Sequence, residues 1–159
     1  MKLQTESSPD EVIDAVISAS RVLVAVAARS LSDIADEVTL AQYRTLVVLA
    51  SRGPQNLAGL AEAIGVTPAT ATRMCDRLAK KRLIVRRTER NDRRQVRLAL
   101  SAKGATLVST VTNRRRDEIE KILRAVTPHD RTVLVGALHQ FALAAGEVPE
   151  QDWSTGWDL

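Results

Sequence analysis

The sequence predicts a mainly helical fold, in the order α-α-α-α-β-β-α-α, with one two-stranded β-hairpin. Three observations lead to this prediction. Helix-start signals recur along the chain, and apolar residues between them repeat with the helical period of about 3.6 residues. Only the stretch from Leu83 to Leu100 contains runs typical of strands. Aromatic residues make up 3% of the 159 residues and hydrophobic residues 45%, so the core consists of small and aliphatic side chains, which suits closely packed helices.

The first two helices begin at capping boxes. The run Ser-Pro-Asp-Glu from Ser8 offers an N-cap, a proline at the first helical position and an acid at the third. It predicts a long helix over about residues 9–35. A Thr-x-x-Gln box from Thr39 predicts a second helix to about residue 51.

The next two helices are separated by a tight turn. A short helix from about Leu57 to Ile64 ends at Gly65, which favours a left-handed terminus. The pair Thr67-Pro68 then caps a fourth helix that runs to about Lys81.

Two strands follow, over residues 83–88 and 95–100. The second alternates, which predicts that Val96, Leu98 and Leu100 point inward. Ser101 caps a fifth helix to about residue 125, and Thr127 a sixth to about residue 145. The tail, residues 146–159, has no period and is expected to be a loop.

The positive charge of the chain is concentrated in its middle third. Residues 51–100 contain twelve Lys and Arg against four Asp and Glu, a net charge of +8 in a chain whose total is +4. Localised positive charge attracts polyanions such as nucleic acid. The alternative is a solvated cationic face without a partner.

The third and fourth helices have the pattern of a helix-turn-helix. Ala61 supplies the small residue at the crossing, and Ala71, Met74, Cys75 and Leu78 have the spacing of an inward stripe. Small and hydroxyl side chains on the outer surface allow close approach to base edges, and arginine can reach guanine or phosphate. The expected DNA-binding residues of this helix are Pro68, Ala69, Thr70, Thr72, Arg73 and Arg77. An ordinary helical hairpin with a polar outer face is the alternative.

The loop between the two strands is rich in arginine. Arg90, Arg93 and Arg94 lie at its tip, where they repel one another unless an anion is present. A loop arginine inserted into a narrow minor groove meets enhanced negative potential. Asp92 is a counter-charge that could hold a neighbouring arginine in one orientation.

Residues 57–104 resemble the MarR family of winged helix-turn-helix transcriptional regulators. The likeness rests on the following motifs: Leu60-Ala61, Gly65, Thr70-x-x-Arg73, Asp76-Arg77-Leu78, Asp92-Arg93-Arg94 and Leu100-Ser101-x-x-Gly104. The resemblance implies that the fourth helix enters the major groove of double-stranded DNA. It also implies that Arg94, on the hairpin wing, enters the minor groove and that Asp92 orients the wing.

The chain departs from the family pattern at two places. Arg82 stands where the family usually has a helix-ending glycine, so a strained turn is expected. Ala58-Gly59 replaces the usual polar cap and acid of the third helix, which leaves Asn56 as the expected cap.

We interpret the chain as one domain, residues 1–159, with a winged helix-turn-helix lobe over 39–100. Helices in 9–35 and 101–145 are expected to form a homodimer, as the resemblance implies, so that two half-sites are read. The expected C-terminal seam consists of Leu134, Leu138 and Phe141 with Ala137, continued by Leu107, Val111, Ile119 and Ile122. Alternatively, these faces complete the core of the monomer.

The resemblance also implies a small acidic or aromatic effector, near Tyr43 or Arg44. Cys75, the single cysteine, falls on the inward stripe, where a buried, inert thiol is expected. His129 and His139 have no nearby ligand partners, so no metal site or cofactor is expected.

The leading hypothesis is a cytoplasmic, sequence-specific DNA-binding repressor that recognises a palindromic operator. The alternative is a winged-helix protein-interaction module without specific DNA binding. No nucleophile–base set or phosphate loop is present, so an enzyme is not expected. No apolar run approaches the roughly 18 residues of a membrane span.

Overall fold

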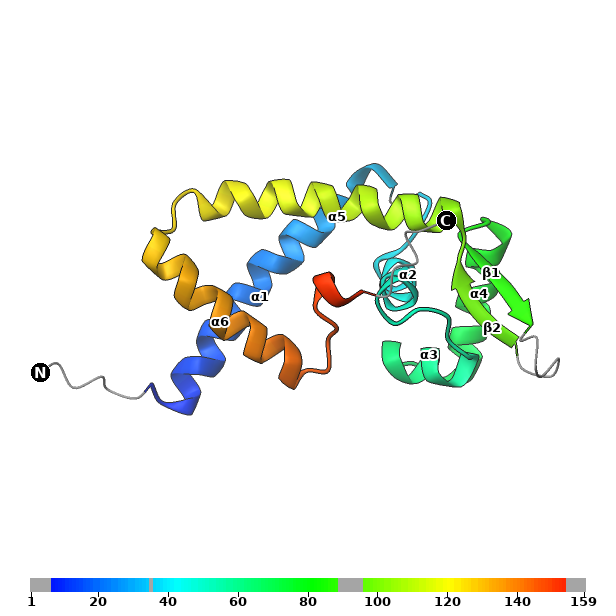
Figure 1. The fold of residues 1–159 in the computed structure, drawn as a ribbon, viewed down its shortest axis with the longest axis horizontal. Coiled ribbons are helices and arrows are strands. Elements are labelled where there is room, and N and C mark those ends of the chain that lie inside the picture. The colour runs from blue at the N-terminus through cyan, green and yellow to red at the C-terminus, as the bar shows by residue number, and fades with distance from the viewer. Residues whose placement is uncertain (1–6, 35, 89–95, 154–159) are drawn as a thin grey trace, which may run out of the picture.

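The computed structural model describes residues 7–34, 36–88 and 96–153, and within them it confirms the predicted order of helices and hairpin (Figure 1). The helices are α1 (Pro9–Leu31), α2 (Leu40–Arg52), α3 (Leu57–Ile64), α4 (Pro68–Lys80), α5 (Ala102–Leu123) and α6 (Pro128–Ala144). The strands are β1 (Ile84–Thr88) and β2 (Val96–Leu100), and 3-10 turns lie at Ser32–Ile34 and Glu150–Asp152.

The helices begin at the predicted caps. Each N-cap side chain accepts a hydrogen bond from the backbone N–H three positions further on; the caps are Ser8, Thr39, Asn56, Thr67, Ser101 and Thr127. The first two are complete capping boxes, in which the side chains of Glu11 and Gln42 accept from the cap's own N–H. Such caps stabilise a helix by about 1 kcal/mol each.

Two predicted boundaries are wrong by a few residues. The first helix was expected to reach residue 35, but its α-helical part ends at Leu31 and continues as the 3-10 turn. The Ser32 hydroxyl donates to the carbonyl of Arg29 (2.9 Å), a local bond that competes with regular helix geometry. The first strand begins one residue later than predicted, at Ile84; Gln95, the predicted start of the second strand, lies outside the described residues.

The core surrounds α2, which is buried along most of its length. Leu46, Leu60, Leu78 and Leu83, from four different segments, are fully buried there. Val96 was expected to point inward. It is 48% exposed, and it lines an open hollow together with Leu57 of α3 and Thr72 of α4.

The predicted seam is wrong at two positions of α5. Leu107 and Val111 are buried in the core of the same chain, so they are not available to a second subunit. Ile119 is half-buried and Ile122 is exposed. The period of an amphipathic helix shows which residues share a face, but not whether that face meets the same chain or another.

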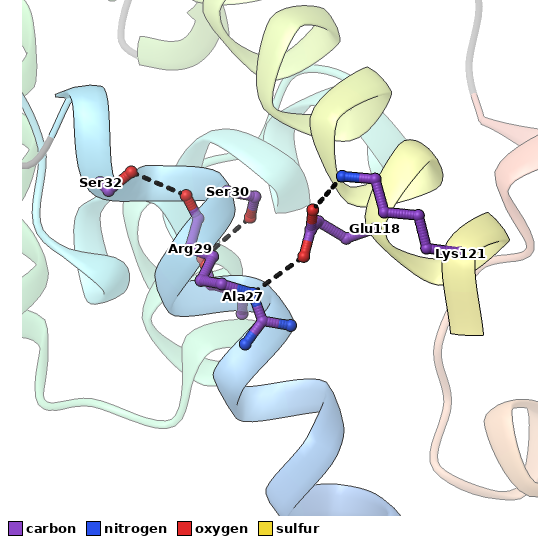
Figure 2. Close-up of polar contacts among 6 residues, drawn as sticks. All are labelled: Ala27, Arg29, Ser30, Ser32, Glu118 and Lys121. Atoms are coloured by element: carbon purple, nitrogen blue, oxygen red, sulfur yellow. Dashed lines mark hydrogen bonds and ion pairs between the residues drawn. The ribbon is translucent and has the colours of Figure 1, made fainter.

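An ion-pair cluster joins α1 to α5 (Figure 2). Glu118 on α5 accepts from the Nε of Arg29 on α1 (2.9 Å) and from the Nζ of Lys121 one turn away (2.7 Å). The hydrogen bonds from Lys121 and then Arg29 hold the pKa of Glu118 below its ordinary value. The cluster ties the two long helices together at the side remote from the hairpin.

The apolar faces of α1 and α6 are largely uncovered. No residue of α6 is buried, and the N-terminal part of α1 exposes Val12, Ile13 and Ile17. No helix in the described ranges is both long and apolar enough to cross a bilayer.

The segment after α6 was expected to be a loop, and it contains a short 3-10 turn and packs against the core. It turns back toward α2 (Figure 1), forms the turn at Glu150–Asp152 and packs half-buried Trp153 against the core. The indole Nε1 of Trp153 donates to the carbonyl of Val148 (3.1 Å). Trp157 lies outside the described residues.

Candidate nucleic-acid interface

The scaffold of the helix-turn-helix is built as the sequence predicts. Gly65 ends α3 with a φ of 70°, and its N–H and that of Val66 bond back to carbonyls of α3. Leu60 and Ala61 are buried where α3 meets α4. The Asn56 side chain accepts from the N–H of Gly59 (2.7 Å), which confirms the expected cap. These contacts fix the direction in which α4 starts.

The inward stripe of α4 is also confirmed. Ala71, Cys75 and Leu78 are buried, and half-buried Met74 accepts a hydrogen bond on its sulfur from the Thr45 hydroxyl (2.9 Å). The opposite face of the helix therefore stays outside the core.

All predicted contact residues of α4 lie on this uncovered side. Pro68, Ala69, Arg73 and Arg77 are exposed, and Thr70 and Thr72 are half-buried. The Thr72 hydroxyl donates to the carbonyl of Pro68 (2.9 Å), so its oxygen remains available only as an acceptor. Within the described ranges, the guanidinium groups of Arg73 and Arg77 form no hydrogen bond or ion pair.

An ion pair that the sequence did not reveal joins α4 to the hairpin. Asp76, expected only to face outward, bonds through Oδ1 to the guanidinium of Arg86 on β1. The pair holds the first strand against the fourth helix, so the two elements present one continuous surface. Because the partners are ten residues apart on different elements, sequence spacing gave no signal for it.

The hairpin pairs in antiparallel register, and this register puts two arginines opposite each other. Arg87 on β1 faces Arg97 on β2, and Thr88 faces Val96 at the distal end. Like charges directly across a ladder repel unless an anion lies between them. The two arginines, with Pro54 and Thr88, line an open surface hollow of about 300 Å³. We add Arg87 and Arg97 to the candidate residues; only the register reveals them.

The hairpin is anchored through the middle of β2 to the segment after α2. Gln55 and Leu98 exchange two backbone hydrogen bonds, of 2.9 and 2.7 Å. The arginine-rich tip, with Arg90, Asp92, Arg93 and Arg94, lies outside the described residues, so its role stays a prediction from the sequence.

The strained turn expected at Arg82 is present. Arg82 has a φ of 59°, and it is the only residue other than glycine with a positive φ in the described ranges. Its N–H bonds to the carbonyl of Ala79 and that of Leu83 to the carbonyl of Leu78, the arrangement that usually places glycine at this position. The turn is held on its far side by Ser101, whose hydroxyl donates to the Arg82 carbonyl (2.6 Å).

Gly104 lets α5 approach this turn closely. A Cβ built there would lie 2.0 Å from the carbonyl oxygen of Leu83. The glycine is therefore required by the packing of α5 on the start of the hairpin, although it lies early in a helix. The pair of Ser101 and Gly104 thus sets the position of β1.

The two residues proposed for an effector lie side by side on α2 but in different surroundings. Tyr43 is buried, and its ring lies 5.6 Å below the guanidinium of Arg115. Burial raises the pKa of Tyr43, and a hydrogen bond to Thr112 opposes that rise. Arg44 is half-exposed and makes two bonds, of 3.1 and 2.6 Å, to the carboxylate of Glu147 in the tail.

The thiol of Cys75 is buried, and burial raises its pKa, so the thiol form is favoured over the reactive thiolate. No group of three potential metal ligands occurs within the described part of the chain.

The expected seam on α6 lies on the surface of the chain. Leu134, Leu138 and Phe141 are 38%, 49% and 55% exposed. Together with Val133 and Val135, also exposed, they form an apolar surface on this helix that the described part of the chain does not bury.

Comparison with known proteins gives a consistent result. The family model described as MarR family matches residues 38–96, the span from the start of α2 to the start of β2. The HTH-type transcriptional repressor MdtR of Bacillus subtilis (strain 168) is 29% identical over 119 residues, which are 75% of this chain and 77% of the repressor.

Solved structures match over nearly the whole chain. RV1404 from Mycobacterium tuberculosis is 42% identical, with a TM-score of 0.82, over 92% of this chain and 99% of that one. BpsR from Bordetella bronchiseptica, whose DNA binding is regulated by 6-hydroxynicotinic acid, is 23% identical, with a TM-score of 0.62, over 83% of this chain and 98% of that one. At that identity the second match is a likeness of fold.

Proposed function

This chain belongs to the MarR family of winged-helix transcriptional regulators, and from this we propose that it is a cytoplasmic homodimeric repressor that binds a palindromic operator and releases it when a small acidic or aromatic ligand binds. The observation that supports this most strongly is the continuous surface formed by the outer face of α4 and the basic hairpin. The net charge of +8 over residues 51–100 belongs to the segment that builds this surface.

In this proposal α4 enters the major groove. The small side chains of Pro68 and Ala69 allow the start of the helix to come close to base edges, and Thr70 and Thr72 offer hydroxyls there. Arg73 and Arg77 are exposed, without an intramolecular partner in the described ranges, and long enough to reach guanine or phosphate.

The hairpin contacts the flanking backbone and minor groove. Arg94, with Arg90 and Arg93, enters the minor groove, and Asp92 orients the tip. Arg87 and Arg97 face each other next to the last described pair of the hairpin and line one open hollow, where they can contact the phosphate backbone.

We assign residues 39–100 to the DNA-binding lobe and the helices in 9–35 and 101–145 to the dimer, with residues 146–159 as a tail. The exposed apolar side chains of α1 and α6 support this division, because monomeric proteins rarely expose continuous apolar faces of this kind. Leu134, Leu138 and Phe141 would lie in the interface.

The ligand site is proposed at Arg44, beside buried Tyr43. A guanidinium that already holds one carboxylate in a two-bond arrangement can hold another. An acidic ligand would therefore compete with Glu147, and its ring would lie toward the half-buried surface around Trp153. The regulation of BpsR by an aromatic acid is compatible with this class of ligand.

Selection of genomic fragments by the purified protein tests the proposal. We expect recovered fragments to share a palindrome whose half-sites lie about one helical turn apart, roughly 10 base pairs centre to centre. Recovery of unrelated fragments in proportion to their abundance would contradict it and would favour a winged-helix protein-interaction module.

A further inference from the structure

Helix α6 is fixed at its two ends and not along its length. At its start, Arg131 donates to the carbonyls of Val126 (3.0 Å) and Leu123 (2.7 Å), which ties the helix to the end of α5. At its end, Arg52 of α2 donates to the carbonyl of Gly146 (3.1 Å). Between these two points no side chain of the helix is buried.

The segment that follows α6 contacts both α2 of the DNA-binding lobe and α5. We call residues 147–153 the strap. Glu147 bonds to Arg44 of α2, and Glu150 bonds to Arg116 of α5 (2.8 Å). Trp153 closes the strap against the core, and Arg115 lies over Tyr43 under the same region. Two acidic side chains of the strap thus meet arginines from two different helices.

The position of the strap links the two parts of the molecule (Figure 1). One end continues from α6, a helix of the proposed dimer interface; Glu147 contacts α2, at the centre of the DNA-binding lobe, and Glu150 contacts α5. The chain itself connects the lobe to α6 through α5. The strap therefore adds a second attachment and restricts rotation between α6 and α2.

We propose that the strap fixes the angle between the lobe and α6 and thereby sets the separation of the two recognition helices, with Arg44 and Glu147 as positioning residues for half-site spacing. This inference rests on the proposed function, because it requires a dimer that reads two half-sites. A dimer with a fixed separation loses less freedom on binding than a loose one. It also discriminates more strongly against altered spacing.

The ion pair between Arg44 and Glu147 holds the strap on α2, and its partial exposure allows another carboxylate to displace Glu147. The side chains of Arg44 and Glu147 are 42% and 36% exposed, and ion pairs at such sites contribute modestly to stability. A carboxylate ligand that takes the place of Glu147 on Arg44 would detach the strap.

The experiment uses the full chain with Trp157→Phe, so that Trp153 is the single fluorescent indole. Three further versions of this protein are made: Glu147→Gln, the charge exchange Arg44→Glu with Glu147→Arg, and the control Glu120→Gln. Glu120 is an exposed carboxylate whose one ion pair within the described residues is with Arg124, one turn away, so its substitution makes the same charge change without joining or separating elements. Acrylamide quenching of Trp153, sedimentation, and affinity for a selected operator and for a copy lengthened by one base pair are measured.

We expect Glu147→Gln to make Trp153 about twice as accessible to acrylamide and to weaken operator binding by up to about fivefold, the upper end of what one exposed ion pair contributes. Its preference for the correct spacing should fall, and the dimer should persist. The charge exchange should restore both the quenching and the spacing preference toward those of the Trp157→Phe protein.

Unchanged quenching in Glu147→Gln would show that the pair does not hold the strap. Increased quenching with unchanged spacing preference would show that the strap does not set the spacing. Either result overturns the inference. If the Trp157→Phe protein itself prefers no DNA sequence, the proposed function fails, and this inference fails with it.

Discussion

At Arg82 a residue other than glycine adopts a left-handed backbone conformation. The chain closes three helices with a residue of positive φ in this arrangement, at Gly65, Arg82 and Gly146. Two of these residues are glycines, for which the conformation is free of steric strain. At Arg82 the side chain crowds the backbone, and the contacts of Ser101 with the turn hold it in place.

Replacement of Arg82 by glycine should therefore stabilise the protein. Relief of the left-handed conformation is worth about 1–2 kcal/mol, and the added freedom of glycine in the unfolded chain removes about 0.5–1 kcal/mol of this. We expect a net gain in the free energy of unfolding of about 0.5–1 kcal/mol, measured by urea denaturation. The control Lys80→Gly, in regular helix two residues earlier, should lose about as much; a loss in both variants would show that the turn at Arg82 is not strained.

Two arginines of the proposed interface should differ in the kind of defect that they cause. Arg94→Ala removes a contact to the backbone or minor groove, so affinity should fall for all DNA sequences and the dependence of log Kd on log salt should decrease by about one unit. Arg73→Ala removes a contact at base edges, so preference at particular base positions should relax, with a loss of about 1–3 kcal/mol on the best site.

Titrations of both variants over a range of salt concentrations, with DNA variants of the operator, separate these effects. The exposed Arg124→Ala, at the end of α5 and remote from the proposed interface, serves as the control for loss of one positive charge. An Arg94→Ala protein with unaltered affinity and salt slope would contradict the assignment of the wing.

At the scale of elements, the ion pair between Arg29 and Glu118 links α1 to α5. The pKa of this carboxyl is lowered by its hydrogen bonds, so the folded protein favours the charged form more than the unfolded chain does. The stabilisation is present above the unfolded pKa and is lost as the pH falls through the folded pKa.

The protein should accordingly be more stable than Glu118→Gln at neutral pH, and the difference should vanish in acid, below the ordinary pKa of glutamate. Urea unfolding at pH 7, 5 and 3 measures the difference. Glu120→Gln, which breaks a pair within α5 alone, should show a smaller dependence on pH. A gap for Glu118→Gln that stays constant down to pH 3 would mean that the carboxylate charge does not hold α1 to α5.

Local signals predicted the starts of the elements, and tertiary contacts decided what the sequence left open. Caps such as Asn56 act within one turn, so their residues alone reveal them. The facing of Arg87 and Arg97 follows from strand register, and the burial of Leu107 follows from which helix lies opposite. Both depend on residues distant in the sequence.

For the candidate site too, the sequence predicted the features that follow from local pattern and missed the tertiary contacts. The outward face of α4 follows from helical period, and the structure has it as expected. The pair of Asp76 and Arg86, and the strap that binds Arg44, were not found because each joins segments whose spacing has no characteristic value. An aperiodic segment such as residues 147–153 gives no sign of the surface on which it folds.

At the scale of the whole molecule, α6 should be required for assembly and not for folding. Leu138 is exposed and lies outside the core cluster. Leu138→Glu should therefore leave the helical content of the protein unchanged. Placing a carboxylate in the proposed apolar interface should nevertheless dissociate the dimer. Sedimentation velocity measures this, with Gln140→Glu, at an exposed polar position of the same helix, as the control. A dimeric Leu138→Glu protein would move the interface elsewhere.

The central claim is that this regulator recognises a particular DNA sequence through α4 and the wing. Competitive titration of an operator fragment, selected from genomic DNA, against random DNA of equal length, at several salt concentrations, tests it most directly. We predict that the operator is bound at least about 10³-fold more tightly at physiological salt, with both affinities falling as salt rises. Equal affinity for the two DNAs, or binding to neither, would contradict the claim.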